Sequence, residues 1–198
     1  VIARARLESE PAGSALEELL GNGMLLNMED GEWRMDGLVM TAAQYQALQE
    51  KTLQIVTEYH KSFPLRKGIP REELKSKLKL LPRVFNISIS RIDNQKQLME
   101  NGSFVALPSH KVTFDSGQQT KVQALMRKFA ANPFGPPSVK ECQVEVGEEV
   151  YAALIEMDEL AAVSQEVVFR TSDYEAMVEK VKSAIAKNGQ ATLAEVRD

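Results

Sequence analysis

Residues 171–198 read TSDYEAMVEKVKSAIAKNGQATLAEVRD. Apolar side chains recur at i, i+3, i+4, i+7 and i+11 from Tyr174 to Ile185, a spacing that predicts an amphipathic helix behind a Thr/Ser cap at Thr171. Gly189 predicts the end of this helix, and a second helix is expected from Thr192. The stretch has the pattern of the first part of a helical module.

The same pattern occurs earlier in the chain, where Thr41 and Ser116 also open amphipathic helices after a short apolar ribbon. The helix from Thr41 is expected to end before Pro64, because the residue preceding a proline avoids helical backbone angles. A short helix should begin at Pro70 and a third should run from Pro82 to about Leu98, closed by Asn101-Gly102. Residues 104–107 and 112–114 then have the pattern of two strands with a turn between them.

The following copy begins at Ser116. Ser138 is expected to cap its short second helix, and Gly147 to Met157 to form its third. Residues 160–163 and 167–169 predict the closing ribbon.

The start of the chain has the pattern of the end of such a unit. A short helix is expected over Ser14–Leu20 and is ended by Gly21. Asp30-Gly31 between apolar runs predicts a tight hairpin, against which Trp33 should pack.

Three helices closed by a small hairpin form a winged helix, which is a helix-turn-helix with a β wing. We therefore predict a mainly α fold with small β hairpins, built as tandem winged-helix domains. The predicted domains are the C-terminal part of a first winged helix, a second, a third, and the N-terminal part of a fourth, at residues 1–41, 42–115, 116–170 and 171–198.

Composition favours a soluble protein without chemistry of its own. Apolar residues make up 43% of the chain and charged residues 26%, and no stretch is apolar enough to span a bilayer. We expect a cytoplasmic location and no membrane partner. Cys142, His60 and His110 are too few and too scattered for a metal site or a catalytic set, so no metal ligand and no catalytic residue is predicted. Cys142 is expected in a core, and His110 in the turn of the second wing. His60 is expected as a structural or exposed residue at a helix end, where a cation is favoured.

Charge is distributed unevenly along a chain whose net charge is −4. Residues 61–83 are rich in Lys and Arg, whereas residues 141–168 contain acids and no base. Phosphate contacts require positive charge rather than base readout, so the basic segment supplies candidate RNA-phosphate contacts. These candidates are Arg66, Lys67, Arg71, Lys75 and Lys77. The alternative is a solvated basic helix face.

Three stretches resemble one family when taken together: residues 59–78, YHKSFPLRKGIPREELKSKL; residues 134–142, FGPPSVKEC; and residues 189–198, GQATLAEVRD. In this order and at this spacing they resemble the C-terminal extension of the bacterial selenocysteine-specific translation elongation factor, of SelB type. Residues 85–102 look longer than the family pattern. No Gly-x-x-x-x-Gly-Lys-Ser/Thr loop occurs, so no cofactor-binding residue is predicted in this chain.

The resemblance implies an RNA-binding protein of translation. Family members carry an N-terminal GTPase, which uses GTP and magnesium and brings selenocysteinyl-tRNA to the ribosome. Four winged helices follow, and the last binds an mRNA hairpin (SECIS) beside a UGA codon. The family's hairpin-reading residues fall beyond Asp198, so none is transferred here.

Three functions remain open from the sequence. The first is a spacer between GTPase and mRNA-binding module, and the second is a DNA-binding winged-helix transcriptional regulator. A regulator needs a basic reading helix, whereas residues 147–157, GEEVYAALIEM, contain three acids and no base. The third is a protein-docking module that uses this acidic face.

Overall fold

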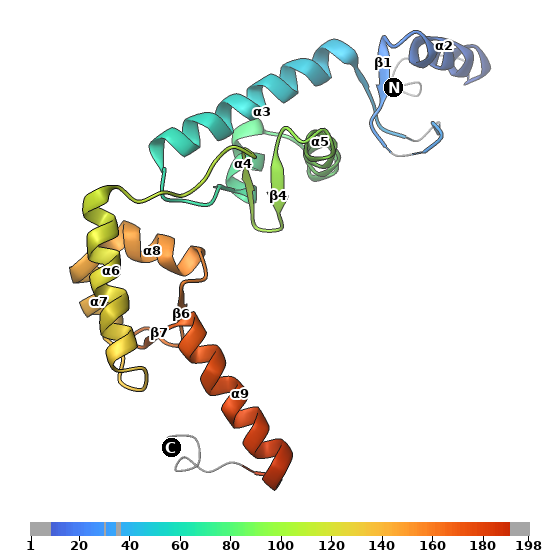
Figure 1. Ribbon diagram of the computed structural model, residues 1–198. Coiled ribbons are helices and arrows are strands. Elements are labelled where there is room, and N and C mark those ends of the chain that lie inside the picture. Colours follow the sequence, from blue (N-terminus) through green and yellow to red (C-terminus); the bar gives the residue numbers. More distant parts are fainter. Residues whose placement is uncertain (1–8, 30, 35–36, 191–198) are drawn as a thin grey trace. The chain divides into compact units, whose positions relative to one another are not determined.

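The computed structural model describes residues 9–29, 31–34 and 37–190 (Figure 1). The chain forms two compact units, and the connector at residues 64–67 belongs to the second although both of its flanks belong to the first. The units comprise Val1–Phe63 with Gly68–His110, and Pro64–Lys67 with Lys111–Asp198.

The first unit begins with a helix and a ribbon. Helix α2 (Ser9–Gly21) starts earlier than expected, and β1 (Leu25–Asn27) pairs with β2 (Val39–Thr41) in antiparallel fashion. The last pair is Asn27 with Val39, so residues 28–38 connect the strands. The ribbon is confirmed. A two-residue turn at Asp30-Gly31 is wrong, since β1 ends at Asn27, four positions before Gly31, and β2 begins only at Val39. Asp30 lies outside the described residues.

Helix α3 (Ala42–Ser62) confirms the amphipathic helix after the ribbon. Thr41 Oγ1 accepts a hydrogen bond from the Gln44 backbone N–H at 3.1 Å, and the Gln44 side chain accepts one from the Thr41 N–H. This capping box satisfies N–H groups that have no partner within the helix. The helix ends at Ser62, with Phe63 as its C-cap residue, before Pro64 as expected.

The helix-turn-helix and its wing complete the first unit. Helices α4 (Arg71–Leu78) and α5 (Pro82–Asn94) follow, and a three-stranded sheet has the order β3-β5-β4. Its strands are β3 (Ile69–Pro70), β4 (Met99–Asn101) and β5 (Phe104–Ala106), of which β3 was not expected.

The predicted third helix was too long and the predicted wing too late. Helix α5 ends at Asn94, because Lys96 adopts a left-handed conformation and Leu98 turns fully into the core. Gly102 and Ser103 form the turn of the wing between β4 and β5, and Gly102 has φ +48°. Residues 112–114 are not a strand, and Val112 and Phe114 pack against the core of the second unit.

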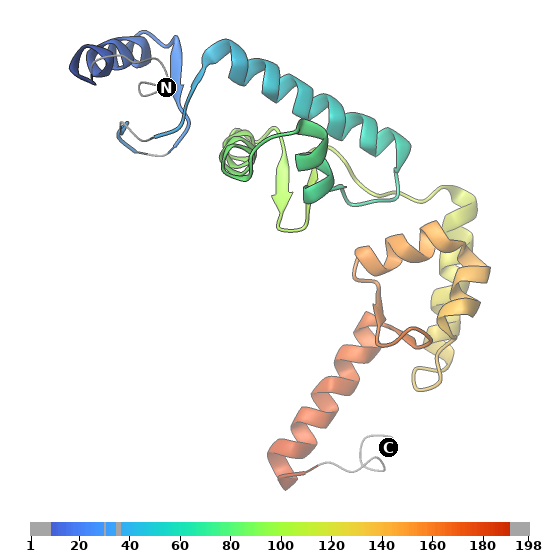
Figure 2. The same cartoon turned by 180° about the vertical axis from the view of Figure 1, so that it is seen from behind.

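One core holds the first unit together. Figures 1 and 2 show α3 running over α4 and beside the wing. Phe85 and Ile92 of α5 and Ile69 of β3 are fully buried, so α5 and β3 contribute to this core together with α3. The buried cluster consists of Met28, Tyr45, Val56, Ile69, Leu74, Leu78, Phe85, Ile89, Ile92, Leu98 and Val105.

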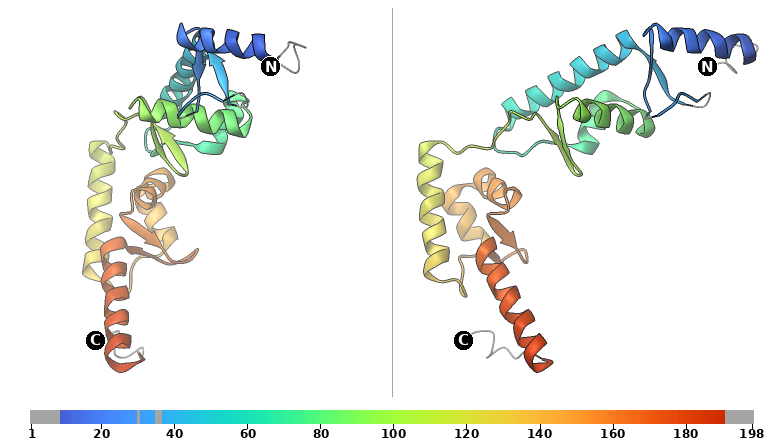
Figure 3. Two further views of the ribbon diagram at one scale, coloured as in Figure 1. Left: turned by 90° about the vertical axis from the view of Figure 1, so that its right-hand side faces the viewer. Right: turned by 45° about the vertical axis from the view of Figure 1, so that its right-hand side comes forward.

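The second unit repeats this order of elements (Figure 3). Its elements are α6 (Ser116–Ala131), α7 (Val139–Val146), α8 (Glu148–Glu156), β6 (Leu160–Ala162) and β7 (Val168–Arg170). Asp115 rather than Ser116 caps α6, with its Oδ1 accepting from the Gln118 N–H at 2.8 Å. Ser138 caps α7 as predicted.

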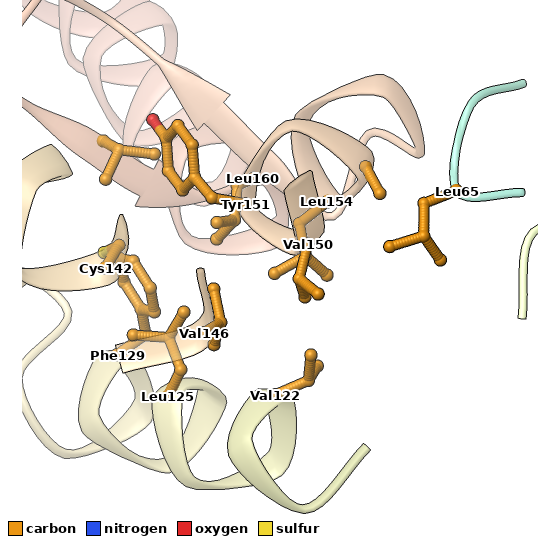
Figure 4. Packing of buried hydrophobic residues seen from close by; sticks show 12 residues of the cluster. Leu65, Val122, Leu125, Phe129, Cys142, Val146, Val150, Tyr151, Leu154 and Leu160 are labelled. Atoms are coloured by element: carbon orange, nitrogen blue, oxygen red, sulfur yellow. The ribbon is translucent and has the colours of Figure 1, made fainter. Parts of the chain in front are cut away.

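A separate core fills the second unit, and Figure 4 shows it from close by. Phe129, Leu125 and Leu154 are almost completely buried there. Cys142 is also buried, as expected of a small core residue. Leu65, from the connector, joins this cluster from the side of Leu154.

Helix α9 (Thr171–Asn188) follows the second ribbon and confirms the helix predicted from its apolar spacing. A Thr/Ser cap is wrong, because Arg170 is the N-cap residue and its guanidinium pairs with Asp173 at 2.6 Å. Gly189, at φ +74°, ends the helix as expected. None of the described side chains of α9 is buried, and the helix expected from Thr192 lies outside the described residues.

The fold class is thus confirmed as mainly helical with small β hairpins in winged-helix order. The division into four domains stays a prediction. Within the described part of the chain, no helix is long and apolar enough to cross a membrane.

Candidate nucleic-acid interface

The five candidate phosphate contacts are divided between the two units. Arg66 and Lys67 lie in the connector that belongs to the second unit, whereas Arg71, Lys75 and Lys77 lie on α4 in the first. The five residues therefore do not form one surface within either unit.

The two connector cations face carboxylates of the second unit. Arg66 pairs with Glu156 at the end of α8, and the same carboxylate accepts the backbone N–H of Lys67 at 3.2 Å. Lys67 Nζ lies 3.4 Å from Asp158. With Leu65 buried beside them, these contacts hold the connector against α8, and a phosphate would compete with them.

Arg71 is the most enclosed of the three cations on α4. It pairs with Glu100 of β4, donates a hydrogen bond to Asn86 Oδ1 at 2.9 Å, and lies 5.0 Å from the centre of the Phe85 ring. Only 20% of its side chain is exposed. These contacts tie α4, α5 and the wing together, which gives Arg71 a structural role inside the unit.

Lys75 and Lys77 pair within their own helix. Lys75 contacts Glu72, and Lys77 lies 3.4 Å from Glu73. Exposed pairs of this kind contribute little free energy, so a phosphate can displace them at low cost. A phosphate therefore displaces the partners of these two candidates most easily, and Lys77, with a side chain 50% exposed, is more accessible than Lys75, at 28%.

Helix α5 carries a polar face that the sequence reasoning did not single out. In a helix-turn-helix, the second helix of the motif reads nucleic acid, and here that helix is α5. Its outward residues Asn86, Ser90 and Asn94 are four apart, so they lie along one side of the helix. That spacing was the available signal, but the alternation of Asn86–Ser90 suggested a strand and obscured it.

The first ribbon covers part of this face. Arg83 pairs with Glu29 at 2.5 Å, and Arg91 donates to the Asn27 carbonyl at 2.6 Å while its guanidinium lies 5.4 Å from the centre of the Tyr45 ring. Residues 27–29 therefore lie against part of the reading helix, whereas Asn86, Ser90 and Asn94 stay exposed beside them.

A hollow of about 340 Å³ remains between the ribbon and α5. Its walls combine two apolar side chains with several polar ones. The lining residues are Met28, Glu29, Asn86, Ile87, Ser90, Arg91 and Asn94.

The corresponding helix of the second unit, α8, is unsuited to a phosphate backbone. Glu148 and Glu149 occupy its first turn, and Glu156 lies at its end beside Arg66. Its sequence contains no Lys or Arg, and like charges repel phosphates.

His60 is a structural residue at the end of α3, as expected, whereas its charge and the place of His110 differ from expectation. His60 is 8% exposed and accepts a hydrogen bond at Nε2 from the Leu107 N–H, 3.1 Å away. Burial, and then the neighbouring His110, lower the pKa of His60 to about 4, so it is neutral rather than a cation. His110 stacks on His60 after the wing and is not at the wing tip.

No metal or thiolate chemistry is supported by the described side chains. Among the described residues, no group of three or more His, Cys, Asp or Glu side chains is placed to hold a metal ion. Burial, with Glu145 and Glu141 nearby, raises the pKa of Cys142 to about 11, which keeps the thiol protonated and unreactive.

Comparison with known proteins agrees with these observations. Residues 53–107 match the family described as the elongation factor SelB winged helix. A selenocysteine-specific elongation factor of Desulfomicrobium baculatum is 22% identical over 200 residues, covering 97% of this chain and 31% of that protein. The chain thus spans less than a third of the relative that it matches.

A solved structure is also similar: the bacterial selenocysteine-specific elongation factor EF-Sec, with a TM-score of 0.41 and 15% identity. The match covers 86% of this chain and 29% of that one. A TM-score of this size adds nothing to the sequence matches.

Helix-turn-helix units, each closed by a small wing, define a tandem winged-helix protein. Two comparisons indicate one group within this class of tandem winged-helix proteins. They are the family match over residues 53–107 and the curated relative, which covers 97% of the chain. Through these two matches, the chain is similar to the winged-helix region of the SelB-type, selenocysteine-specific elongation factors. The family resemblance is confirmed, and a DNA-binding regulator is not favoured.

Proposed function

We propose that the chain is a tandem winged-helix spacer in a selenocysteine-specific elongation factor. It links a GTPase that carries selenocysteinyl-tRNA to a last module that binds the SECIS hairpin of the mRNA, in UGA-directed selenocysteine incorporation on the cytoplasmic ribosome. The supporting observation is the SelB winged-helix match at residues 53–107. The partly covered α5 and the acidic α8 agree with it, since the first ribbon pairs with Arg83 of α5 and α8 carries no base.

GTP and magnesium would be held by another part of the full protein. The sequence contains no phosphate-binding loop of the Gly-x-x-x-x-Gly-Lys-Ser/Thr type, and Mg²⁺ in such sites is bound with the nucleotide phosphates. The residues of this chain set the distance and the orientation between the GTPase and the mRNA-binding module. No catalytic step is assigned to them.

The spacer function is tested in the full-length factor. Residues 42–170 are replaced by a flexible Gly/Ser linker, and UGA readthrough is measured with a reporter, alongside GTP hydrolysis and binding of the mRNA hairpin. We expect readthrough to be lost while the two separate activities persist, because a flexible chain sets no fixed distance or angle. Unchanged readthrough would show that the winged helices are not needed as a spacer.

The five basic residues are proposed to touch tRNA or ribosomal RNA phosphates. Lys75 and Lys77 are best placed, because their partners Glu72 and Glu73 are exposed neighbours on the same helix. Arg66, Lys67 and Arg71 would each have to give up a carboxylate partner in their own unit before contacting a phosphate.

Salt dependence tests these contacts. For Lys75→Gln with Lys77→Gln in the full-length factor, the slope of log affinity against log salt should fall by about 0.7–0.9 per lost phosphate contact. Lys121→Gln with Lys180→Gln removes equal charge from α6 and α9 and serves as the control. Equal slopes for both double variants and the unmodified factor would exclude Lys75 and Lys77 as contacts.

A further inference from the structure

The hollow beside α5 lies within the first unit and joins residues far apart in the sequence. Met28 and Glu29 come from the ribbon connection, and the other lining residues come from one side of α5. Met28 is 4% exposed and belongs to the core of the unit, so this wall of the hollow is firmly packed.

The lining of the hollow combines apolar and polar side chains. Met28 of the ribbon connection and Ile87 of α5 supply apolar surface, and Asn86, Ser90 and Asn94, which also lie on α5, supply polar groups. Amide and hydroxyl groups both donate and accept hydrogen bonds, as the edges of nucleobases do. Asn86 Oδ1 already accepts from Arg71, which leaves its amide N–H groups for a ligand.

Arg91 is held rigidly at the same place. Its Nη1 donates to the Asn27 carbonyl and its guanidinium lies over the Tyr45 ring, so the planar cation is fixed before any ligand arrives. Guanidinium planes stack on bases and attract phosphates. Glu29, the one acid of the lining, is paired with Arg83.

Size and access limit what can enter. A volume of about 340 Å³ is at the lower end of ligand pockets, which suits a single small ligand. The ribbon that closes one side keeps a duplex from α5, whereas an unstacked base of a single strand can be inserted alone.

We propose that this hollow binds one unpaired nucleotide of an RNA, with the base between Met28 and Ile87 and its polar edge toward Asn86, Ser90 and Asn94. The covered reading helix of the second winged helix thereby contacts a single-stranded RNA loop instead of a duplex groove. This site is separate from the phosphate contacts on α4.

The test measures binding of a fluorescently labelled eight-nucleotide single-stranded RNA of mixed sequence to the chain. Ser90→Leu fills the hollow without removing charge, and Asn94→Ala removes one polar group. Ser76→Leu, at an exposed position on α4, is the matched control. Ser90→Leu should weaken binding about tenfold, as expected for loss of one stacked and hydrogen-bonded base, and the control should not.

Two further arms identify the source of the nucleotide. The same RNA annealed into a full duplex should bind at least about tenfold more weakly than the single strand, since its bases stay stacked. Millimolar nucleoside monophosphates should not displace the RNA; displacement would assign the hollow to a free nucleotide and overturn the RNA proposal.

Equal binding by the Ser90→Leu and Ser76→Leu variants would also overturn it. Because Ser90→Leu leaves the charge unchanged, it should not alter the salt slope. A loss of affinity at an unchanged salt slope therefore reports on the hollow, whereas a change of the salt slope reports on the lysines of α4.

Discussion

The imidazole rings of His60 and His110 stack with their centroids 3.5 Å apart and an angle of 19° between the planes. His60 lies at the end of α3, and its Nε2 accepts the Leu107 N–H just after the wing. An acceptor nitrogen in a buried ring requires neutral imidazole, so the pair joins α3 to the chain behind the wing only while His60 is unprotonated.

Stability of the first unit should therefore fall in mild acid. His60 has a folded-state pKa of about 4 against about 6.5 when unfolded, so the unfolded chain binds the additional proton. Neutral His60 makes its full contribution to the free energy of unfolding above pH 6.5. As the pH falls from 6.5 toward 4, that free energy decreases by up to about 1.4 kcal/mol per pH unit. Urea denaturation at several pH values, followed by Trp33 fluorescence, measures the slope.

His60→Gln is the control, because its amide oxygen can still accept the Leu107 N–H but does not titrate in this range. Carboxylates contribute equally to the pH dependence of the unmodified chain and of the His60→Gln variant. The difference between their slopes of unfolding free energy against pH therefore measures the effect of His60 alone. Identical slopes would contradict the assignment.

Gly68 should not tolerate a side chain. A Cβ at this position would lie 2.5 Å from the Val105 carbonyl oxygen and 2.9 Å from its carbon, both backbone atoms of the paired strand β5. Gly68→Ala must separate β3 from β5 and should cost about 1–3 kcal/mol of unfolding free energy, measured by urea denaturation. Gly21→Ala, where nothing lies within 4 Å, is the control and should be near neutral; similar losses in both variants would count against the close approach.

The cap of α7 should contribute measurably to the second unit. Ser138 Oγ accepts the Glu141 N–H at 3.3 Å, and Glu141 Oε2 accepts the Ser138 N–H at 2.8 Å. Ser138→Ala should lower the unfolding free energy by about 1 kcal/mol, and calorimetry should show the loss in the second unit. Ser183→Ala, at an exposed position within α9, should show no comparable effect.

Leu65 should stabilise the second unit, although it lies far before residues 111–198, which form the main part of that unit. Its side chain is 9% exposed within that core, so Leu65→Ala should cost about 2 kcal/mol or more. Amide hydrogen exchange should become faster in α8 and α6 but not in α5. Leu81→Ala, 73% exposed, is the control, and equal exchange in the two variants would remove Leu65 from the core.

The helices could be predicted from the sequence because their signals are local. Thr41, Ser138 and Gly189 lie at the ends of helices α3, α7 and α9, close to the expected positions. Caps and apolar periodicity depend on neighbours three and four residues away, which a single sequence displays.

The wing could not be placed in this way. The alternation of Val112 and Phe114 suggested a strand, but it arises because both side chains pack against the core of the second unit. The strands of the wing have three residues each, too few to show a period, and β3 has two.

Ion pairing explains why the candidate site was only partly predictable. A basic segment suggests phosphates, yet the partners Glu156 and Glu100 lie 90 and 29 positions after Arg66 and Arg71, where sequence gives no sign of them. The hollow depends on Met28 meeting α5, a contact between residues about 60 positions apart.

The position of Leu65 has a practical consequence for dissecting this protein. A gene split between residues 110 and 111, the apparent boundary, would express a C-terminal piece whose hydrophobic interior has an empty place. A plasmid for that piece should supply residues 64–67 separately, as an added peptide or through a circular permutation, so that the missing leucine is restored.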